Sequence, residues 1–193
     1  MTDTQNKSEA ARTLRADAAR NEDAVLLAAK EVFLRSGVDA PVREVANQAG
    51  VGVGTLYRRF PKRSDLIKAV FRREIDACAD AAPKLAETLE PGDAVAEWLM
   101  LYAGFMGTKK GLATALHSGD DAYADLPGYF RERFEPALAD LLERAKKADV
   151  IRADVKPYDL LRAIGNLSFA EGDDRDAHVK QMVSLMIGGL LAR

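Results

Sequence analysis

A chain of 193 residues with 48% hydrophobic content is expected to be globular, with room for two small domains. Its net charge of −2 argues against a surface that is basic throughout. Its single cysteine excludes an internal disulfide framework, and its two distant histidines argue against a Cys/His zinc site. It holds no run of 18 apolar residues and no signal-like segment, so we expect a cytoplasmic protein without membrane contact, metal or other cofactor.

The charge is distributed unevenly along the chain. Residues 41–75 hold eight Lys/Arg and three Asp/Glu, whereas residues 76–193 hold 14 and 20. This asymmetry favours a protein that touches DNA with one face and uses the remainder for another purpose. Residues 1–20 are polar and are predicted to be a disordered basic arm, whose arginines either enter a minor groove or stay solvated.

The first predicted elements are helices within residues 21–66. A helix from about Asn21 to Ser36 has apolar residues on one side and ends at Gly37. A second, shorter helix has an apolar stripe at i, i+3, i+4 and i+7, formed by Val42, Val45, Ala46 and Ala49. Gly50 ends this helix, because glycine adopts without strain the left-handed conformation that a tight turn needs.

The third helix is predicted to have two different sides. The side that packs on the preceding stripe carries Val53, Leu56 and Phe60. The opposite side carries Gly54, Thr55 and Arg58. Small residues let a helix approach a groove closely, and hydroxyl and guanidinium groups reach base edges. We therefore predict a helix-turn-helix with these DNA-contacting residues: Arg43, Val53, Gly54, Thr55, Tyr57, Arg58, Arg59, Lys62 and Arg63.

This stretch resembles the helix-turn-helix of the TetR family of transcriptional regulators. The matching residues are Ala49-Gly50-Val51, Gly54-Thr55-Leu56-Tyr57, Phe60 and Lys62, and the resemblance extends back to Ala28 and forward to Leu66. It implies a homodimer that binds a palindromic double-stranded DNA operator, most often as a repressor, and releases it when a small-molecule effector binds. One position departs from the pattern, because Gly52 stands where the family usually has Ser or Thr as helix cap and phosphate ligand.

Residues 67–193 are predicted to form an antiparallel helical domain, which the resemblance assigns to ligand sensing and dimerisation. No β-type alternation is present, so the expected fold is all-α with about nine helices. A linking helix from about Arg63 to Ala82 places Cys78 in its apolar stripe. Pro83 and Pro91-Gly92 are predicted to break the chain on either side of a further short helix, and Asp93 is predicted to cap the helix after it. Further helices are expected over residues 111–118, 127–148, 157–169 and 176–191.

The last of these helices is apolar on more than one side, which is too broad for packing on its own protomer alone. Paired with the helix that begins at Pro157, it is predicted to form a four-helix isologous dimer interface. The predicted interface residues are Leu160, Ile164, Leu167, Met182, Leu185 and Met186.

A group of mostly aromatic residues in the second domain has two interpretations. They line a cavity for an apolar effector, with a histidine as a polar contact, or they are packed core. The residues are Trp98, Tyr102, Phe105, Met106, His117, Tyr129, Phe130 and Phe134.

Two other functions were weighed against a ligand-responsive regulator. A helical interaction protein of the same fold without sequence-specific DNA binding is hinted at only by Gly52. An enzyme would have to use the acidic pairs Asp120-Asp121 and Asp173-Asp174 together with His117. No nucleophile, base and orienting group occur at a usable spacing, so we assign no catalytic residue and predict that the chain is not an enzyme.

Overall fold

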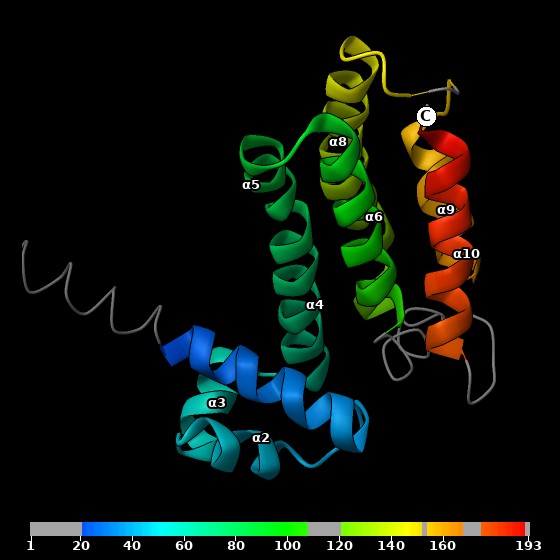
Figure 1. The fold of residues 1–193 in the computed structure, drawn as a ribbon. Helices are drawn as coiled ribbons and strands as arrows, with labels where there is room; N and C mark the ends of the chain where they lie inside the picture. Colours follow the sequence, from blue (N-terminus) through cyan, green and yellow to red (C-terminus); the bar gives the residue numbers. More distant parts are fainter. Residues whose placement is uncertain (1–20, 108–120, 152–153, 168–174, 192–193) are drawn as a thin grey trace, which may run out of the picture. The chain divides into compact units, whose positions relative to one another are not determined.

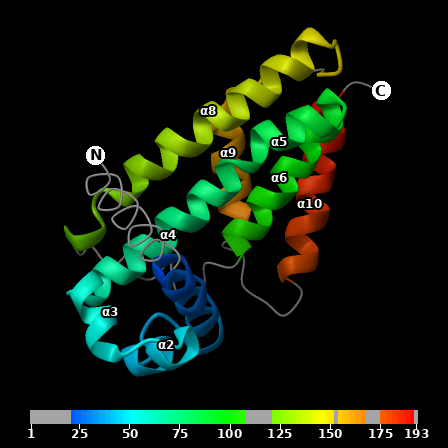
Figure 2. The ribbon, with the colours of Figure 1, turned by 90° about the vertical axis from the view of Figure 1, so that its left-hand side faces the viewer.

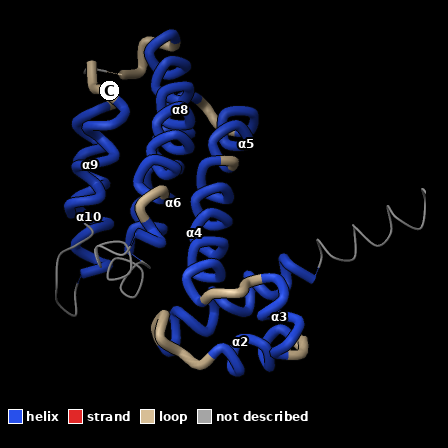
Figure 3. The backbone as a smooth tube through the Cα atoms, turned by 180° about the vertical axis from the view of Figure 1, so that it is seen from behind, coloured by secondary structure: helices blue, strands red, loops and turns tan. Residues whose placement is uncertain are grey.

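The computed structural model describes residues 21–107, 121–151, 154–167 and 175–191. Within these ranges the regular elements are helices, and an isolated antiparallel bridge joins Ile151 to Leu191 (Figures 1 and 3). The predicted all-α class is confirmed. The chain divides into two compact units, the first ending at Val70 and the second beginning at Phe71, whereas the boundary predicted from the sequence lies after Leu66.

The first unit contains a helix over residues 21–36, then α2 (Val42–Ala49), α3 (Val53–Arg59) and the start of α4 (Arg63–Ala79). Apolar residues from all of these elements form one core, which includes Val32, Val45, Leu56, Phe60 and Leu66. Gly50 has φ 67° and ψ 26°, the left-handed conformation predicted for the turn between α2 and α3. The amide of Val51 then donates to the carbonyl of Ala46 at 3.0 Å and closes this turn.

The second unit is a helical bundle that contains the rest of α4 and the elements after it. These are α5 (Ala81–Thr88), α6 (Pro91–Gly107), a short 3-10 helix η1 (Asp121–Tyr123), α8 (Leu126–Lys147), α9 (Pro157–Leu167) and α10 (Arg175–Leu190). Helix α6 packs against α5, α8 and α10, and α9 packs against α8 and α10 (Figures 1 and 2). Apolar side chains of these helices form a single core around Trp98, and Cys78 is buried in it as predicted.

Some predicted helix boundaries were wrong. The linking helix ends at Ala79 instead of Ala82, and α5 begins at Ala81. Pro83 lies in the first turn of α5, where a proline leaves no intrahelical hydrogen bond unmade, so it does not break this helix. Asp93 lies within the first turn of α6, which begins at Pro91, and is therefore not its cap. The helix predicted over residues 111–118 and the end of the one predicted over 157–169 lie outside the described residues.

Candidate nucleic-acid interface

Helix α3 has one buried edge and one exposed side. Leu56 and Phe60 are buried in the core of the first unit, and Val53 is half-buried against it. Thr55 and Arg58 are exposed on the other side of the helix, and the side chain of Tyr57 is 48% exposed. The apolar edge therefore fixes the helix on its core while its polar side remains open to a partner.

Arg58 and Thr55 contact each other on the exposed side of α3. The Arg58 guanidinium donates through Nη2 to Thr55 Oγ1 at 3.4 Å and through Nε to the carbonyl of Gly54 at 3.3 Å. Both distances are long for N–H···O hydrogen bonds, which are typically about 2.9–3.0 Å. Neither bond ties the side chain to the core, so the guanidinium can exchange them for a base edge.

Gly54 leaves free space beside these two side chains. A Cβ atom built on Gly54 would have no neighbouring atom within 4 Å, so packing within the first unit does not require glycine there. Its backbone φ is also not positive, so the conformation of α3 does not require glycine either. Because Gly54 has no side chain, the backbone of α3 can approach a DNA groove closely at this position.

The neighbouring cations differ in their surroundings. Arg59 Nη2 lies 2.7 Å from both carboxylate oxygens of Glu22, although the Arg59 side chain remains 62% exposed. Lys62 is exposed, and its backbone N–H donates to Asp65 Oδ2 at 2.9 Å, which caps the start of α4. The ion pair between Arg59 and Glu22 was missed by the sequence analysis, because these residues lie far apart in the chain and nothing in their spacing relates them.

Arg63 is only half exposed, and its guanidinium is occupied. Nε donates to the carbonyl of Val38 at 2.8 Å, and Nη2 donates to the carbonyls of Val38 and Ala40. Arg43, on α2, is exposed. The structure thus presents the predicted DNA-contacting residues on the surface with two exceptions, Val53 and Arg63, which are partly buried.

Gly52 precedes α3 as its cap residue in an extended conformation, with φ −69° and ψ 140°. Its carbonyl accepts hydrogen bonds from the amides of Thr55 and Leu56, but no side chain caps the helix. A Cβ atom at Gly52 would have Thr55 Oγ1 as a neighbour at 3.8 Å, an ordinary van der Waals contact. The site therefore has room for the Ser or Thr that the sequence lacks.

The aromatic residues considered as ligand contacts pack closely on one another. Trp98 stacks on Tyr102 with ring centroids 5.7 Å apart, and Phe134 meets Tyr102 edge to face at 5.2 Å and Phe130 at 4.6 Å. Trp98 Nε1 donates to the carbonyl of Cys78 at 2.9 Å, and the Tyr102 hydroxyl donates to the carbonyl of Leu161 at 3.2 Å. Burial raises the pKa of the Tyr102 phenol above its usual value, so it stays a donor.

Among the other residues of this set, Phe105, Tyr129 and Phe130 are half-buried and Met106 is buried. The Tyr129 hydroxyl is 2.6 Å from Asp76 Oδ1, which also accepts from Arg133 Nε at 2.7 Å. These contacts hold α8 against α4 within the second unit. His117 lies outside the described residues.

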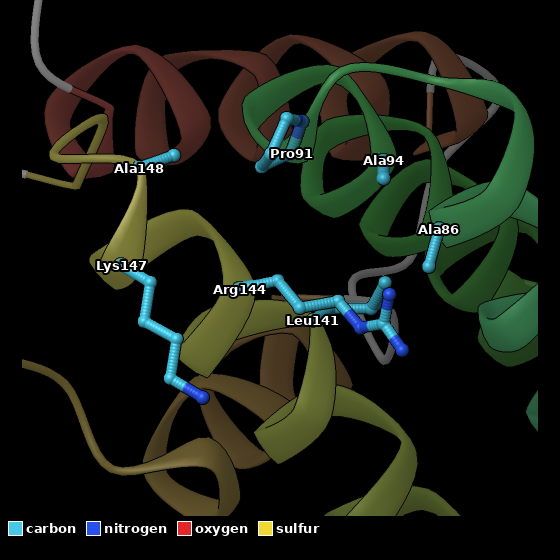
Figure 4. Close-up of a pocket in the computed structure, with 7 residues that line it drawn as sticks. All are labelled: Ala86, Pro91, Ala94, Leu141, Arg144, Lys147 and Ala148. Atoms are coloured by element: carbon cyan, nitrogen blue, oxygen red, sulfur yellow. The ribbon is translucent and has the colours of Figure 1, made fainter.

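A pocket of about 390 Å³ lies between α5, α6 and α8 (Figure 4). Its lining residues are Ala86, Pro91, Ala94, Leu141, Arg144, Lys147 and Ala148. The lining is therefore mostly apolar, with two cations. Arg144 also pairs with Asp140 at 2.8 Å. None of the predicted ligand contacts lines this pocket.

The predicted dimer residues fall into two groups. Leu160 and Ile164 are buried within the chain itself and belong to its own core, because α9 packs against α8 and α6. Leu185 is 65% exposed, and Leu167, Met182 and Met186 are half-buried. An apolar groove of about 310 Å³ runs between α9 and α10, lined by Val155, Asp159, Leu160, Ala163, Met186, Gly189 and Leu190. The exposed apolar surface of this region is thus centred on α10.

The part of the chain that the structure describes offers neither a membrane-spanning helix nor a cluster of metal ligands. Its helices include none that is both long enough and apolar enough to cross a membrane. The same residues contain no group of three or more His, Cys, Asp or Glu side chains placed to hold a metal ion.

Comparison with known proteins relates both units to one family. Residues 25–70 match the family described as "Bacterial regulatory proteins, tetR family", and residues 90–192 match "Transcriptional regulator SbtR-like, C-terminal domain". The TetR transcriptional regulator SCO0520 from Streptomyces coelicolor is 34% identical, with a TM-score of 0.75 over 88% of this chain and 98% of that one. A TetR regulatory protein from Mycobacterium vanbaalenii is 32% identical, with a TM-score of 0.71 over 93% and 99%.

A curated relative is similar only in the N-terminal part. An HTH-type transcriptional regulator of Staphylococcus aureus is 36% identical over 64 residues, which are 33% of this chain and 35% of that protein. The match therefore spans about a third of the relative's length.

Proposed function

This chain belongs to the TetR family of transcriptional regulators, and we propose that it is a ligand-responsive dimeric repressor that binds a palindromic operator in the cytoplasm. It is a regulator with a helix-turn-helix and not an enzyme. The observation that carries the proposal is the exposed side of α3, where Thr55 and Arg58 lie together over a buried edge that fixes the helix. A fixed helix with an exposed guanidinium and hydroxyl is what base readout requires.

In the proposed complex α3 lies in the major groove. Arg58 and Thr55 meet base edges, Gly54 allows the close approach, and Tyr57, Arg59, Lys62 and Arg43 lie where phosphates run. Base contacts carry sequence information, whereas phosphate contacts supply affinity that falls with salt. Loss of Arg58 should therefore relax specificity, and loss of Lys62 should weaken binding to every sequence.

The base contacts of a single recognition helix do not provide enough specificity to select one operator in a genome. Each good base contact contributes about 1–3 kcal/mol, and a genome offers a very large number of competing sites. A two-fold dimer solves this by placing two recognition helices in successive major grooves, about 34 Å apart. The proposed contact surface is the exposed face of α10 with Leu185, Met182 and Met186, and it continues into the groove beside α9.

The second unit is the proposed sensor. Trp98, Tyr102 and Phe134 are fully packed, so an effector among these rings must displace side chains on entering. The pocket between α5, α6 and α8 is already open, and Arg144 and Lys147 beside apolar residues suit an amphipathic anion. A hundredfold loss of operator affinity requires about 2.7 kcal/mol of differential effector binding between the two states of the protein.

Fluorescence anisotropy with labelled duplexes from the region upstream of the protein's own gene tests the proposal. We expect binding that falls steeply with salt, a preference for a duplex containing an inverted repeat over a scrambled duplex of equal composition, and two protomers per repeat. Equal, weak binding to both duplexes would favour the interaction protein without sequence-specific DNA binding. An effector that binds the second unit but leaves operator affinity unchanged would contradict the proposal that operator binding responds to a ligand.

A further inference from the structure

Arg63 differs from the other cations next to α3 in what its side chain touches. Its guanidinium donates from Nε to the Val38 carbonyl at 2.8 Å and from Nη2 to the Ala40 carbonyl at 2.5 Å, with a further bond from Nη2 to Val38. The side chain is half-buried, whereas Lys62, one residue earlier, is exposed. The Arg63 side chain therefore binds two carbonyls of a single backbone segment, which precede it by 25 and 23 residues in the sequence.

These carbonyls belong to the segment that leads into α2. Ala40 is buried, its amide donates to the Gly37 carbonyl at 3.1 Å, and Pro41 follows as the residue before α2. A carbonyl that is shielded from solvent needs a hydrogen-bond partner, and these two part-buried carbonyls find theirs in the Arg63 guanidinium. The planar guanidinium supplies several donors at once, which a lysine ammonium cannot do with the same geometry.

We propose that Arg63 is a positioning residue of the DNA-binding unit and not a phosphate ligand. It ties the first residue of α4 to the segment that starts α2, and α2 in turn packs on α3. The direction in which α3 presents Thr55 and Arg58 then depends on Arg63. To reach a phosphate, the guanidinium would have to give up its hydrogen bonds to both carbonyls. The effect on operator binding rests on the proposed function, whereas the effect on the structure of the DNA-binding unit can be tested on the free protein.

Arg63→Ala and Lys62→Ala, titrated with operator and scrambled duplexes over a range of salt, separate the two roles. For Arg63→Ala we expect an operator affinity lower by about tenfold, with scrambled-duplex affinity and salt slope unchanged. For Lys62→Ala we expect weaker binding to both duplexes and a salt slope smaller by about one. A salt slope that falls by about one in Arg63→Ala as well would overturn the proposal, since that is the signature of a lost phosphate contact.

Hydrogen–deuterium exchange on the free protein supplies a readout that needs no DNA. We expect Arg63→Ala to speed amide exchange over residues 38–49 severalfold, while exchange in α5 and α6 stays unchanged and Lys62→Ala has no such effect. Exchange over residues 38–49 equal to that of the wild type would overturn the proposal. If the wild-type protein shows no operator preference, the proposed function fails, but this comparison still decides the role of Arg63.

Arg63→Lys is tested as a second variant, because it keeps the positive charge and is expected to disturb folding less than Arg63→Ala. A phosphate ligand tolerates this change, whereas a residue that bridges two carbonyls does not. We expect Arg63→Lys to lower the preference for operator over scrambled duplex and to exchange faster over residues 38–49, at an unchanged salt slope. Wild-type behaviour of Arg63→Lys in both measurements would contradict the positioning role.

Discussion

The cationic residues around α3 are chemically alike in the sequence but have different partners in the fold. Among the described residues, Arg58 donates hydrogen bonds to Gly54 and Thr55 of its own helix, Arg59 pairs with Glu22, and Arg63 donates to backbone carbonyls. The sequence pattern was sufficient to predict that α3 exposes Thr55 and Arg58, because that follows from the helical period. It could not predict the partners of Arg59 and Arg63, because these are set by which distant segments the fold brings close.

Glu22 is expected to restrain DNA binding by holding Arg59. Glu22→Gln removes the carboxylate and frees the guanidinium for a phosphate, so affinity for any duplex should rise and the salt slope should steepen by up to about one. Anisotropy titrations over a range of salt measure both quantities. The matched control is Glu31→Gln, which removes a carboxylate that accepts a hydrogen bond from Gln48 at 2.9 Å instead of pairing with Arg59. Identical salt slopes for wild type and Glu22→Gln would show that the ion pair does not compete with phosphate.

At the scale of elements, α2, the turn at Gly50 and α3 follow from local sequence rules. The helix-turn-helix could be predicted because each part has its own local signal. These signals are the apolar stripe of α2, the glycine with positive φ at the turn and the apolar edge of α3. The exact position of the break between α4 and α5 could not be predicted, because it falls at Asp80, which itself has helical dihedral angles and lies three residues before Pro83. The break was predicted at Pro83 itself, whereas Pro83 lies in the first turn of α5, where a proline is tolerated.

Two glycines of the motif should respond to alanine in opposite ways. Gly50 has φ 67°, so Gly50→Ala is expected to lower the free energy of unfolding by about 1–2 kcal/mol. Gly54 is helical with open space beside it, so Gly54→Ala should raise the free energy of unfolding by up to about 1 kcal/mol. The added methyl should nevertheless weaken operator binding. Denaturant unfolding and operator titration together check this, and unchanged operator affinity in Gly54→Ala would mean that α3 does not approach DNA closely there.

At the scale of the whole molecule, each unit has its own core, and α4 continues from one unit into the other. The apolar excess of the last helix could be predicted from the sequence. The sequence could not show which of these apolar residues lie in the core and which lie on the exposed face, because periodicity does not identify the neighbour that covers an apolar stripe. Leu160 and Ile164 turned out to be buried by their own protomer, and Leu185 lies on the exposed face.

Leu185→Glu is expected to convert a dimer into a monomer, because a carboxylate would then be buried without a partner in an apolar interface. Light scattering after gel filtration at several concentrations measures the mass. Leu101→Glu is the control, since Leu101 is also exposed, at 44%, but lies on α6. If Leu185→Glu keeps the mass of the wild-type dimer, the assignment of α10 to the dimer interface is wrong.

We propose that the Thr55 and Arg58 side of α3 binds base edges of DNA as part of a two-fold dimer. Selection of duplexes from a random-sequence pool, run in parallel with wild type and Arg58→Ala, tests this proposal. We predict that the wild type enriches an inverted repeat with half-sites about 34 Å apart, and that Arg58→Ala loses preference at one base pair in each half-site. A wild type that enriches no inverted repeat, or an Arg58→Ala protein with unaltered preference at every position, would contradict it.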